Sequence, residues 1–123
     1  MELNELTYTV IGIALKVHQE LGPGLLESSY KIVLAYQLQQ AGLKVEKEKP
    51  VPLTSNGVKL DCGYRMDILV EEQLVIEIKA VESLHPIHLA QMLTYLKTGG
   101  FHLGLLINFN VLLLKDGIKR VIL

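Results

Sequence analysis

The chain has 123 residues, which fits one compact domain, residues 1–123, with a single core and no room for a second domain. Apolar residues make up 50% of the chain, and 12 basic and 13 acidic residues give a formal charge of −1. No segment resembles the basic stripe of a dedicated nucleic-acid-binding protein, which argues against tight nonspecific binding to DNA. The apolar surplus leaves surface that a second copy could cover, so a homo-oligomer is a fair expectation.

Targeting signals are missing from the sequence pattern. Residues 1–5 are acidic, whereas a secretory signal peptide needs a basic segment before an apolar run. The longest apolar stretch, residues 103–114, is broken by two asparagines and is shorter than the roughly 20 residues that span a bilayer. We therefore expect a cytoplasmic protein with no membrane segment. The single cysteine, Cys62, has no cysteine partner for a disulfide or a zinc site, and we expect it to be a small, half-buried side chain.

Two amphipathic helices are predicted near the start of the chain. Apolar residues recur every three or four positions over Leu3–Leu21, and Gly22-Pro23-Gly24 ends this first helix. The second helix is expected over residues 25–41, and Gly42 directly after it supplies a stop. Glu27 lies on the apolar stripe of this helix, which consists of Tyr30, Leu34, Leu38 and Ala41. An acid in the first turn complements the helix dipole, but on a core-facing stripe it also needs a partner, which a metal site would provide.

Short β-type segments follow the second helix. They are expected at residues 43–53, 58–60, 63–70 and 74–80, with a turn near Ser55-Asn56-Gly57. Residues 71–73 form a polar loop, so the two segments on either side of it are predicted to pair as a hairpin. Pro86 and the periodic run to Lys97 predict a third helix, which Thr98-Gly99-Gly100 ends.

The remaining segments complete a predicted α/β fold. Residues 103–107 form a continuous apolar run, which is typical of a strand covered on both faces. Lys115-Asp116-Gly117 predicts a turn between two β-type segments at residues 111–114 and 118–123. Together the elements predict a mixed β-sheet flanked by helices, in which the third helix crosses over to the buried strand.

The predicted hairpin has one apolar face and one polar face. The apolar face consists of Tyr64, Met66, Ile68 and Val70 in one strand and Leu74, Ile76, Ile78 and Ala80 in the other. Asp67 lies on the opposite face of the first strand, and Glu77 and Lys79 lie on the matching face of the second. A three-residue loop that pairs Val70 with Leu74 places Asp67 directly across from Glu77, with Cβ atoms roughly 5 Å apart. Mg²⁺ or Mn²⁺, which take oxygen ligands, would compensate two charges so close together.

The same hairpin pattern also fits an ordinary solvated strand face. Arg65 is predicted to lie across from Lys79, and the two cations could pair diagonally with Glu77 and Asp67. Such a surface quartet would contribute about 1 kcal/mol or less per pair. On the hairpin alone this interpretation is favoured, because charged strand faces are common.

The third predicted helix carries a polar stripe and an apolar side. The polar stripe consists of His88, Gln91 and Tyr95, and the apolar side of Leu89, Met92, Leu93 and Leu96. Simple exposure to water would explain the polar stripe. His85 and His88 suggest a zinc pair, but they are close together at a helix start and have no evident third ligand. The other two histidines, His18 and His102, are expected to serve packing or capping.

An ordered set of motifs resembles the GxxExxY family, small bacterial and archaeal proteins grouped with the PD-(D/E)xK nuclease superfamily. The name-giving motif is present as Gly24-Leu25-Leu26-Glu27-Ser28-Ser29-Tyr30. The resemblance continues through residues 63–70, 77–81, 91–95 and 105–109, and so covers nearly the whole chain. Two departures are Met66, where the superfamily motif has proline, and Asp61-Cys62 before Gly63, which is expected only to alter a strand edge.

The resemblance implies a restriction-endonuclease-like PD-(D/E)xK core with a metal site. In such a core Asp67 and Glu77 would bind Mg²⁺ or Mn²⁺, Lys79 would position or polarise the attacking water, and Glu27 would complete the acidic shell as a further metal ligand. Gln91 and Tyr95 resemble the Q-x-x-x-Y motif of recombination-type exonucleases, where it helps to orient the site. These are the residues that the resemblance assigns to catalysis.

The predicted function is metal-dependent hydrolysis of phosphodiester bonds in a nucleic acid, with DNA as the expected partner. The alternative is a non-catalytic module that keeps the nuclease fold and binds nucleic acid or protein. The near-neutral charge favours this module, because sequence-independent affinity grows with the number of phosphates that Lys and Arg neutralise. A third interpretation is an oligomeric scaffold whose apolar surplus forms interfaces. The acidic residues and the lysine together favour the nuclease.

Overall fold

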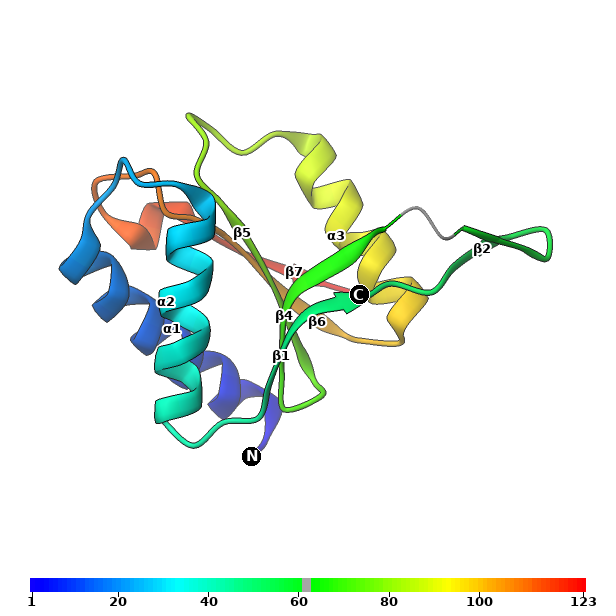
Figure 1. Cartoon of the computed structure of the whole chain (residues 1–123), viewed down its shortest axis with the longest axis horizontal. Helices are drawn as coiled ribbons and strands as arrows, with labels where there is room; N and C mark the ends of the chain where they lie inside the picture. The colour runs from blue at the N-terminus through cyan, green and yellow to red at the C-terminus, as the bar shows by residue number, and fades with distance from the viewer. Residues whose placement is uncertain (61–62) are drawn as a thin grey trace.

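The computed structural model describes residues 1–60 and 63–123. The predictions made for Asp61 and Cys62 therefore lie outside the described residues. Two helices cover one face of a five-stranded sheet and a third helix covers the other face (Figure 1). This arrangement confirms the predicted α/β fold with a mixed sheet between helices. Within the described residues, no helix combines the length and the apolar character needed to cross a bilayer.

The two N-terminal helices form as the apolar spacing predicts. Helix α1 (Leu3–Leu21) has the predicted bounds, and Gly22 ends it with a φ of 70° while its N–H donates to the His18 carbonyl. Helix α2 (Glu27–Gln40) begins two residues later than expected because Leu26 still has extended backbone angles. Their buried side chains recur at helical spacing and consist mainly of Leu6, Val10, Ala14, Val17, Tyr30, Leu34 and Leu38.

Five strands form the central sheet in the order β1-β4-β5-β6-β7. Their bounds are β1 (Val45–Pro50), β4 (Arg65–Val70), β5 (Leu74–Lys79), β6 (Leu103–Asn108) and β7 (Ile118–Ile122). Strands β5 and β6 are parallel and helix α3 (Pro86–Gly99) connects them, whereas the other neighbours are antiparallel. The predicted β4–β5 hairpin is confirmed, with Val70 paired to Leu74.

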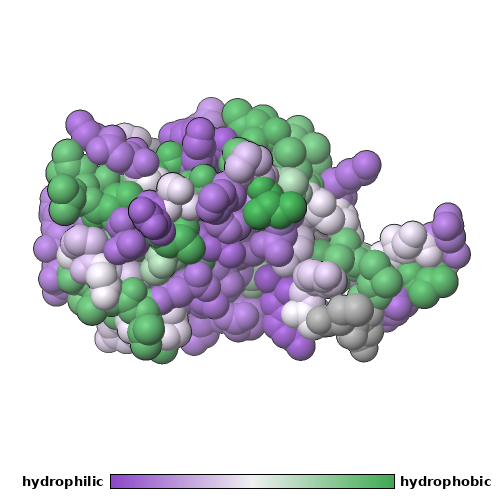
Figure 2. Space-filling model, turned by 90° about the horizontal axis from the view of Figure 1, so that it is seen from above, coloured by the Kyte–Doolittle hydropathy of each residue, from purple (hydrophilic) through white to green (hydrophobic). Residues whose placement is uncertain are grey.

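A short arm projects from the body of the molecule. Strands β2 (Leu53–Ser55) and β3 (Val58–Leu60) form this arm, which extends to the right in Figure 1, and within the described residues they pair only with each other. Helices α2 and α3 begin at the top of Figure 1, and Figure 2 looks onto that end of the molecule. There, hydrophilic residues run through the middle of the surface between hydrophobic regions on either side (Figure 2).

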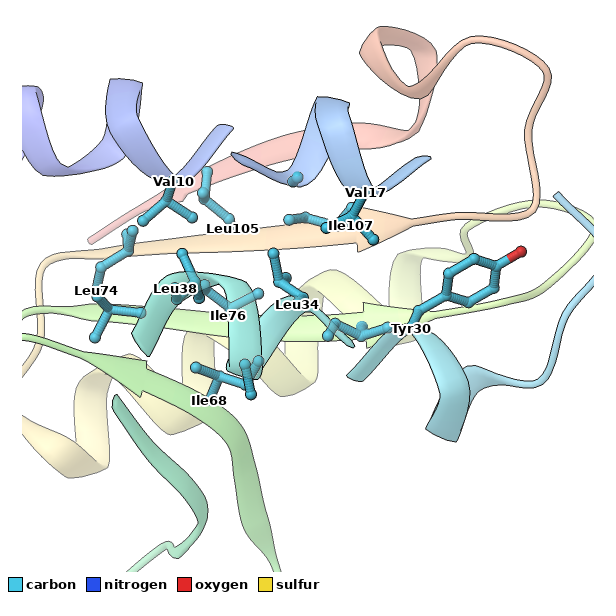
Figure 3. Close-up of a cluster of buried hydrophobic side chains, with 14 of the residues drawn as sticks. Val10, Val17, Tyr30, Leu34, Leu38, Ile68, Leu74, Ile76, Leu105 and Ile107 are labelled. Carbon is cyan, nitrogen blue, oxygen red and sulfur yellow. The ribbon is translucent and has the colours of Figure 1, made fainter. Parts of the chain in front are cut away.

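Each face of the sheet has its own apolar core. On the side of α1 and α2, side chains of both helices pack on β4, β5 and β6, and Figure 3 shows Leu34 and Val17 directed at Ile76 and Ile107. On the side of α3, Met92 and Leu96 pack on residues that include Val75 and Leu106. Every residue of β6 is buried, as its continuous apolar run predicts.

The predicted β-type segment at residues 111–114 is wrong, because the structure places no strand there. The chain turns through a short 3₁₀ helix, η1 (Leu114–Gly117), and β7 pairs directly with β6, with Ile118 opposite Ile107. The free edge of β6 needs backbone partners, and β7 supplies them. The Val111 carbonyl instead lies 2.8 Å from Nε2 of the buried His18, so this histidine, expected to serve packing or capping, contacts the loop through a polar ring atom.

Three smaller expectations are also corrected. Residues 43–53 do not form one segment but two, β1 and β2, separated at Val51 and Pro52. Met66 packs on the α3 side rather than with Ile68, because the β4 alternation breaks opposite Glu48, whose φ is 52°. Leu93 is exposed, so the apolar side of α3 is narrower than expected.

Candidate metal centre

The β4–β5 hairpin opens at Asp67 and Glu77. The paired positions end at Ile68 and Ile76, so Asp67 faces Glu77 as the loop length predicts. Side chains replace the backbone ladder beyond this point. The Asp67 N–H donates to Glu77 Oε2 at 2.8 Å, and the Ile78 N–H donates to Asp67 Oδ2 at 2.8 Å. Each strand therefore holds the carboxylate of the other strand in place.

Glu77 is buried deeply for a carboxylate, with 5% of its surface exposed. Burial raises the pKa of Glu77, and the charge of Asp67 raises it further, to about 9, although Lys79 acts in the opposite direction. At neutral pH the side chain therefore holds a proton unless another positive charge replaces it. A bound divalent cation supplies such a charge and favours loss of the proton from the carboxyl group.

The charges of Lys79 and Glu27 both act on His88, near the start of α3. Burial lowers the pKa of His88, the charges of Lys79 and His85 lower it further, and Glu27 raises it. Within residues 1–60 and 63–123, no three His, Cys, Asp or Glu side chains group as metal ligands. The role of Glu27 as a third ligand therefore stays a prediction.

Helix α3 brings Tyr95 to the carboxylate pair. Tyr95 is buried, and burial raises its pKa to about 12, with the charges of Glu77 and Asp67 contributing. The phenol is therefore neutral at ordinary pH. Gln91, one turn earlier in α3, is half-buried. Tyr95 thus belongs to the surroundings of the pair, and the part that Gln91 plays there stays a prediction.

The two histidines at the start of α3 cap the helix. The His85 N–H donates to His88 Nδ1 at 3.1 Å. This hydrogen bond occupies one of the two ring nitrogens of His88 that could bind a metal ion. It also explains why His85 and His88 lie together without a zinc ion.

The name-giving tyrosine fixes the loop before α2. The Tyr30 hydroxyl donates to the Gly22 carbonyl at 2.6 Å and accepts from the Leu25 N–H at 3.1 Å. Its ring stacks on Phe109, with centroids 4.6 Å apart, and its hydroxyl points away from the apolar cluster (Figure 3). These contacts determine where α2 begins, and therefore where Glu27 lies.

The sequence interpretation missed Lys31, which contacts the carboxylate pair. Lys31 Nζ lies 3.1 Å from Asp67 Oδ1 and 3.1 Å from Glu48 Oε1. The diagonal pairs considered for Arg65 and Lys79 are not formed among the described residues, so the solvated quartet does not account for the hairpin. Lys31 follows Glu27 by one helical turn, and this spacing is the signal that could have pointed to it.

Asn108 is a second residue that the sequence interpretation missed. It is buried at the end of β6, opposite Lys79 in the parallel register. Its Nδ2 donates to the Val81 carbonyl at 2.9 Å, and its Oδ1 accepts from the Val81 N–H at 3.1 Å. Asn108 thereby fixes the chain just after Lys79. The signal is a polar residue at the carboxyl end of a buried parallel strand, where ligand sites of α/β sheets gather.

Comparison with known proteins identifies the family. Residues 4–121 match the family model of the PD-(D/E)XK nuclease superfamily. No curated protein and no solved structure gave a significant match. The mixed sheet between helices agrees with that match, while the narrower GxxExxY assignment stays a prediction. Because the match spans almost the whole sequence, the chain belongs to the PD-(D/E)XK nuclease superfamily.

Proposed function

We propose that the chain is a cytoplasmic metal-dependent nuclease that hydrolyses phosphodiester bonds in nucleic acid, with DNA as its expected substrate. Membership of the superfamily favours a nuclease-type function. The observation that carries the proposal is the facing pair Asp67 and Glu77, each held by a backbone N–H of the opposite strand.

The donor set of this pair suits a hard divalent cation. The cross-strand hydrogen bonds use Asp67 Oδ2 and Glu77 Oε2, which leaves the second oxygen of each carboxylate outside them. Mg²⁺ typically needs only one or two protein carboxylates beside water and substrate phosphate, so two ligands are sufficient. Buried Glu77 also needs a compensating charge when it ionises. Mg²⁺ or Mn²⁺ bound by Asp67 and Glu77, with Glu27 holding a water or a second ion, meets these requirements.

The surrounding residues would carry out hydrolysis as follows. A bound divalent cation supplies polarisation of a phosphoryl oxygen and a lower pKa for a coordinated water. Lys79 would stabilise the negative charge that builds up on the attacking oxygen or on the phosphoryl group. The water oxygen would form a bond to phosphorus and lose a proton to solvent, one ester P–O bond would break, and the leaving sugar oxygen would take up a proton from solvent. Tyr95 and Gln91 would orient the site through hydrogen bonds from α3.

Cleavage assays on matched variants test the proposal. Labelled single-stranded, duplex and branched DNA and RNA are incubated with Mg²⁺ or Mn²⁺. Asp67→Asn and Lys79→Met should each lower the rate by roughly 10²-fold or more, the scale for losing one group that stabilises charge in the transition state. Asp116→Asn and Lys97→Met, which change exposed residues elsewhere, should leave the rate unchanged. Full activity in either site variant would contradict the proposed roles.

The near-neutral charge favours a second candidate function, a non-catalytic module that binds nucleic acid or protein. A chain with a formal charge of −1 gains little sequence-independent affinity for phosphates, which favours an interaction module over an enzyme that binds DNA strongly. Binding of labelled nucleic acid without cleavage in Mn²⁺ would support the module. Sedimentation of the same sample tests the expected homo-oligomer.

A further inference from the structure

Lys31 connects the carboxylate pair to the edge of the sheet. It lies in α2 directly after Tyr30, and its ammonium group is 3.1 Å from one oxygen each of Asp67 and Glu48. The exposed fractions of the three side chains are 23% for Lys31, 15% for Asp67 and 51% for Glu48. Lys31 thus joins a shielded carboxylate of β4 to a more exposed carboxylate of β1.

The oxygen that Lys31 contacts is the one that is more open to a metal ion. Asp67 Oδ2 already accepts the Ile78 N–H, whereas Oδ1 takes no part in the cross-strand hydrogen bonds. A magnesium ion binds an oxygen ligand directly at about 2.0–2.1 Å. An ammonium group and a divalent cation at the same oxygen repel each other, so each weakens the binding of the other.

Glu48 has an unusual backbone conformation for a residue within a strand. The flanking pairs Lys47–Ile68 and Lys49–Met66 place Glu48 opposite Asp67, and its φ is 52°. The other non-glycine residues with positive φ in the described part of the chain lie at turns: Asn56, Glu71 and Glu72. Such a conformation costs free energy, and it persists where the surroundings enforce it. Here the residue with this conformation is Glu48, whose carboxylate is a second acceptor within reach of Lys31.

We propose that Lys31 competes with a divalent cation for Asp67 at the metal centre. Lys31 must release Asp67 before the cation binds, and Glu48 then holds Lys31. This inference rests on the proposed function, because it takes Asp67 and Glu77 as the metal ligands. Lys31 sets how much free metal the site requires. Glu48 weakens this competition, because it offers the ammonium group a partner away from Asp67.

Titration of the purified chain with Mn²⁺, followed by calorimetry, tests the competition without any nuclease assay. Lys31→Met keeps the aliphatic stem and removes the charge, and it should tighten Mn²⁺ binding by about tenfold, which corresponds to ~1.4 kcal/mol. Lys31→Arg keeps the charge and should bind Mn²⁺ as the unmodified chain does. Glu48→Gln should weaken binding, because Lys31 then has only Asp67 as a charged partner.

A double-mutant cycle separates competition from a general effect of charge. If Glu48 acts through Lys31, Glu48→Gln should change Mn²⁺ affinity far less when Lys31 is already Met. If Glu48 acted only through its own negative charge, Glu48→Gln would instead weaken Mn²⁺ binding equally in both backgrounds. The ion pair of Lys49 with Glu46, 3.0 Å apart in the same strand, supplies control variants Lys49→Met and Glu46→Gln. These should show no coupling in Mn²⁺ affinity.

The outcomes distinguish this inference from the proposed function. Mn²⁺ binding that is unchanged in Lys31→Met, or an effect of Glu48→Gln that is the same in both backgrounds, would overturn the competition and leave the metal centre intact. Absence of Mn²⁺ binding in every variant would overturn the metal centre and the competition with it. Binding that tightens in Lys31→Met and shows coupling to Glu48 supports both.

Discussion

The two ends of the β4–β5 hairpin use the same two strands in different ways. At the turn, Val70 and Leu74 are fully buried and paired in the backbone ladder. At the open end, the ladder stops and the backbone N–H groups of Asp67 and Ile78 donate to carboxylates. Apolar burial at one end therefore supplies the free energy that lets the other end hold two acids close together.

Truncation at the apolar end should have the largest effect on stability. Ile76 is fully buried between the sheet and the two N-terminal helices, so Ile76→Ala should lower the free energy of unfolding by about 2–5 kcal/mol. Chemical denaturation measures this change. Ile122→Ala is the matched control, because that strand residue is 74% exposed and its truncation should change stability by no more than about 0.5 kcal/mol. Equal losses in both variants would contradict this account of the core.

Hydrogen bonds that fix the loop next to the open end should have the next largest effect. Tyr30→Phe removes the bonds to the Gly22 carbonyl and the Leu25 N–H, and should lower the free energy of unfolding by about 1–3 kcal/mol. Tyr8→Phe, at a tyrosine that is 80% exposed, should be nearly neutral. If Tyr30→Phe were equally neutral in thermal and chemical unfolding, the hydroxyl would not hold the loop.

Glu77 should make the stability of the open end depend on pH. Its folded pKa of about 9 lies above the ordinary value of 4.5, so between these values the folded chain keeps a proton that the unfolded chain has lost. Stability should therefore fall as pH rises through this range, by up to about 1.4 kcal/mol per pH unit. Glu77→Gln mimics the protonated form and should remove this slope.

Denaturation in the presence of a chelator at several pH values between 5 and 9 measures the slope of each variant. Glu72→Gln, at the turn, serves as the control for removing one negative charge. A slope that stays the same in Glu77→Gln would show that another group binds the proton.

The charged contact at the turn should contribute least. Lys44 Nζ and Glu72 Oε1 are 3.3 Å apart, and both side chains are more than half exposed. Removing the pair with Glu72→Gln should change stability by less than about 1 kcal/mol, and by less still in high salt. Unfolding at low and high salt measures this, and a loss comparable with that of Tyr30→Phe would contradict the contrast between the two ends.

The register of the hairpin was predictable because it depends on local features. A three-residue loop and the alternation of residues 68–70 determine the pairing of Val70 with Leu74, and the facing of Asp67 and Glu77 follows from it. The stripe of α2 that carries Glu27 was predictable for the same reason, since helical spacing is local. These features gave the fold class and brought together the central pair of the candidate site.

The contacts of Lys31 and the pairing of β7 depend on nonlocal features. The Lys31 contact needs the docking of α2 on the sheet. Helical spacing places Lys31 one turn after Glu27, but the neighbouring sequence does not indicate that Asp67 and Glu48, which has a left-handed φ, are its partners. Residues 111–114 are all apolar and residues 118–122 are apolar at three of five positions, so the sequence pattern fits a strand in both segments and does not show which of them pairs. The unpaired edge of β6, which exists only in the assembled sheet, decides between them.

The crossover through α3 has a consequence for the order of refolding. The hairpin closes a short loop, whereas Leu74 meets Leu103 only after the whole of α3 has been placed. The amides of Asp67 and Ile78 should therefore gain protection from solvent exchange before those of β6. Pulse-labelling hydrogen exchange during refolding would reveal this sequence of events, and earlier protection of β6 would refute it. The two acids would then meet before Tyr95 reaches them, so the pair would form while it is still open to water.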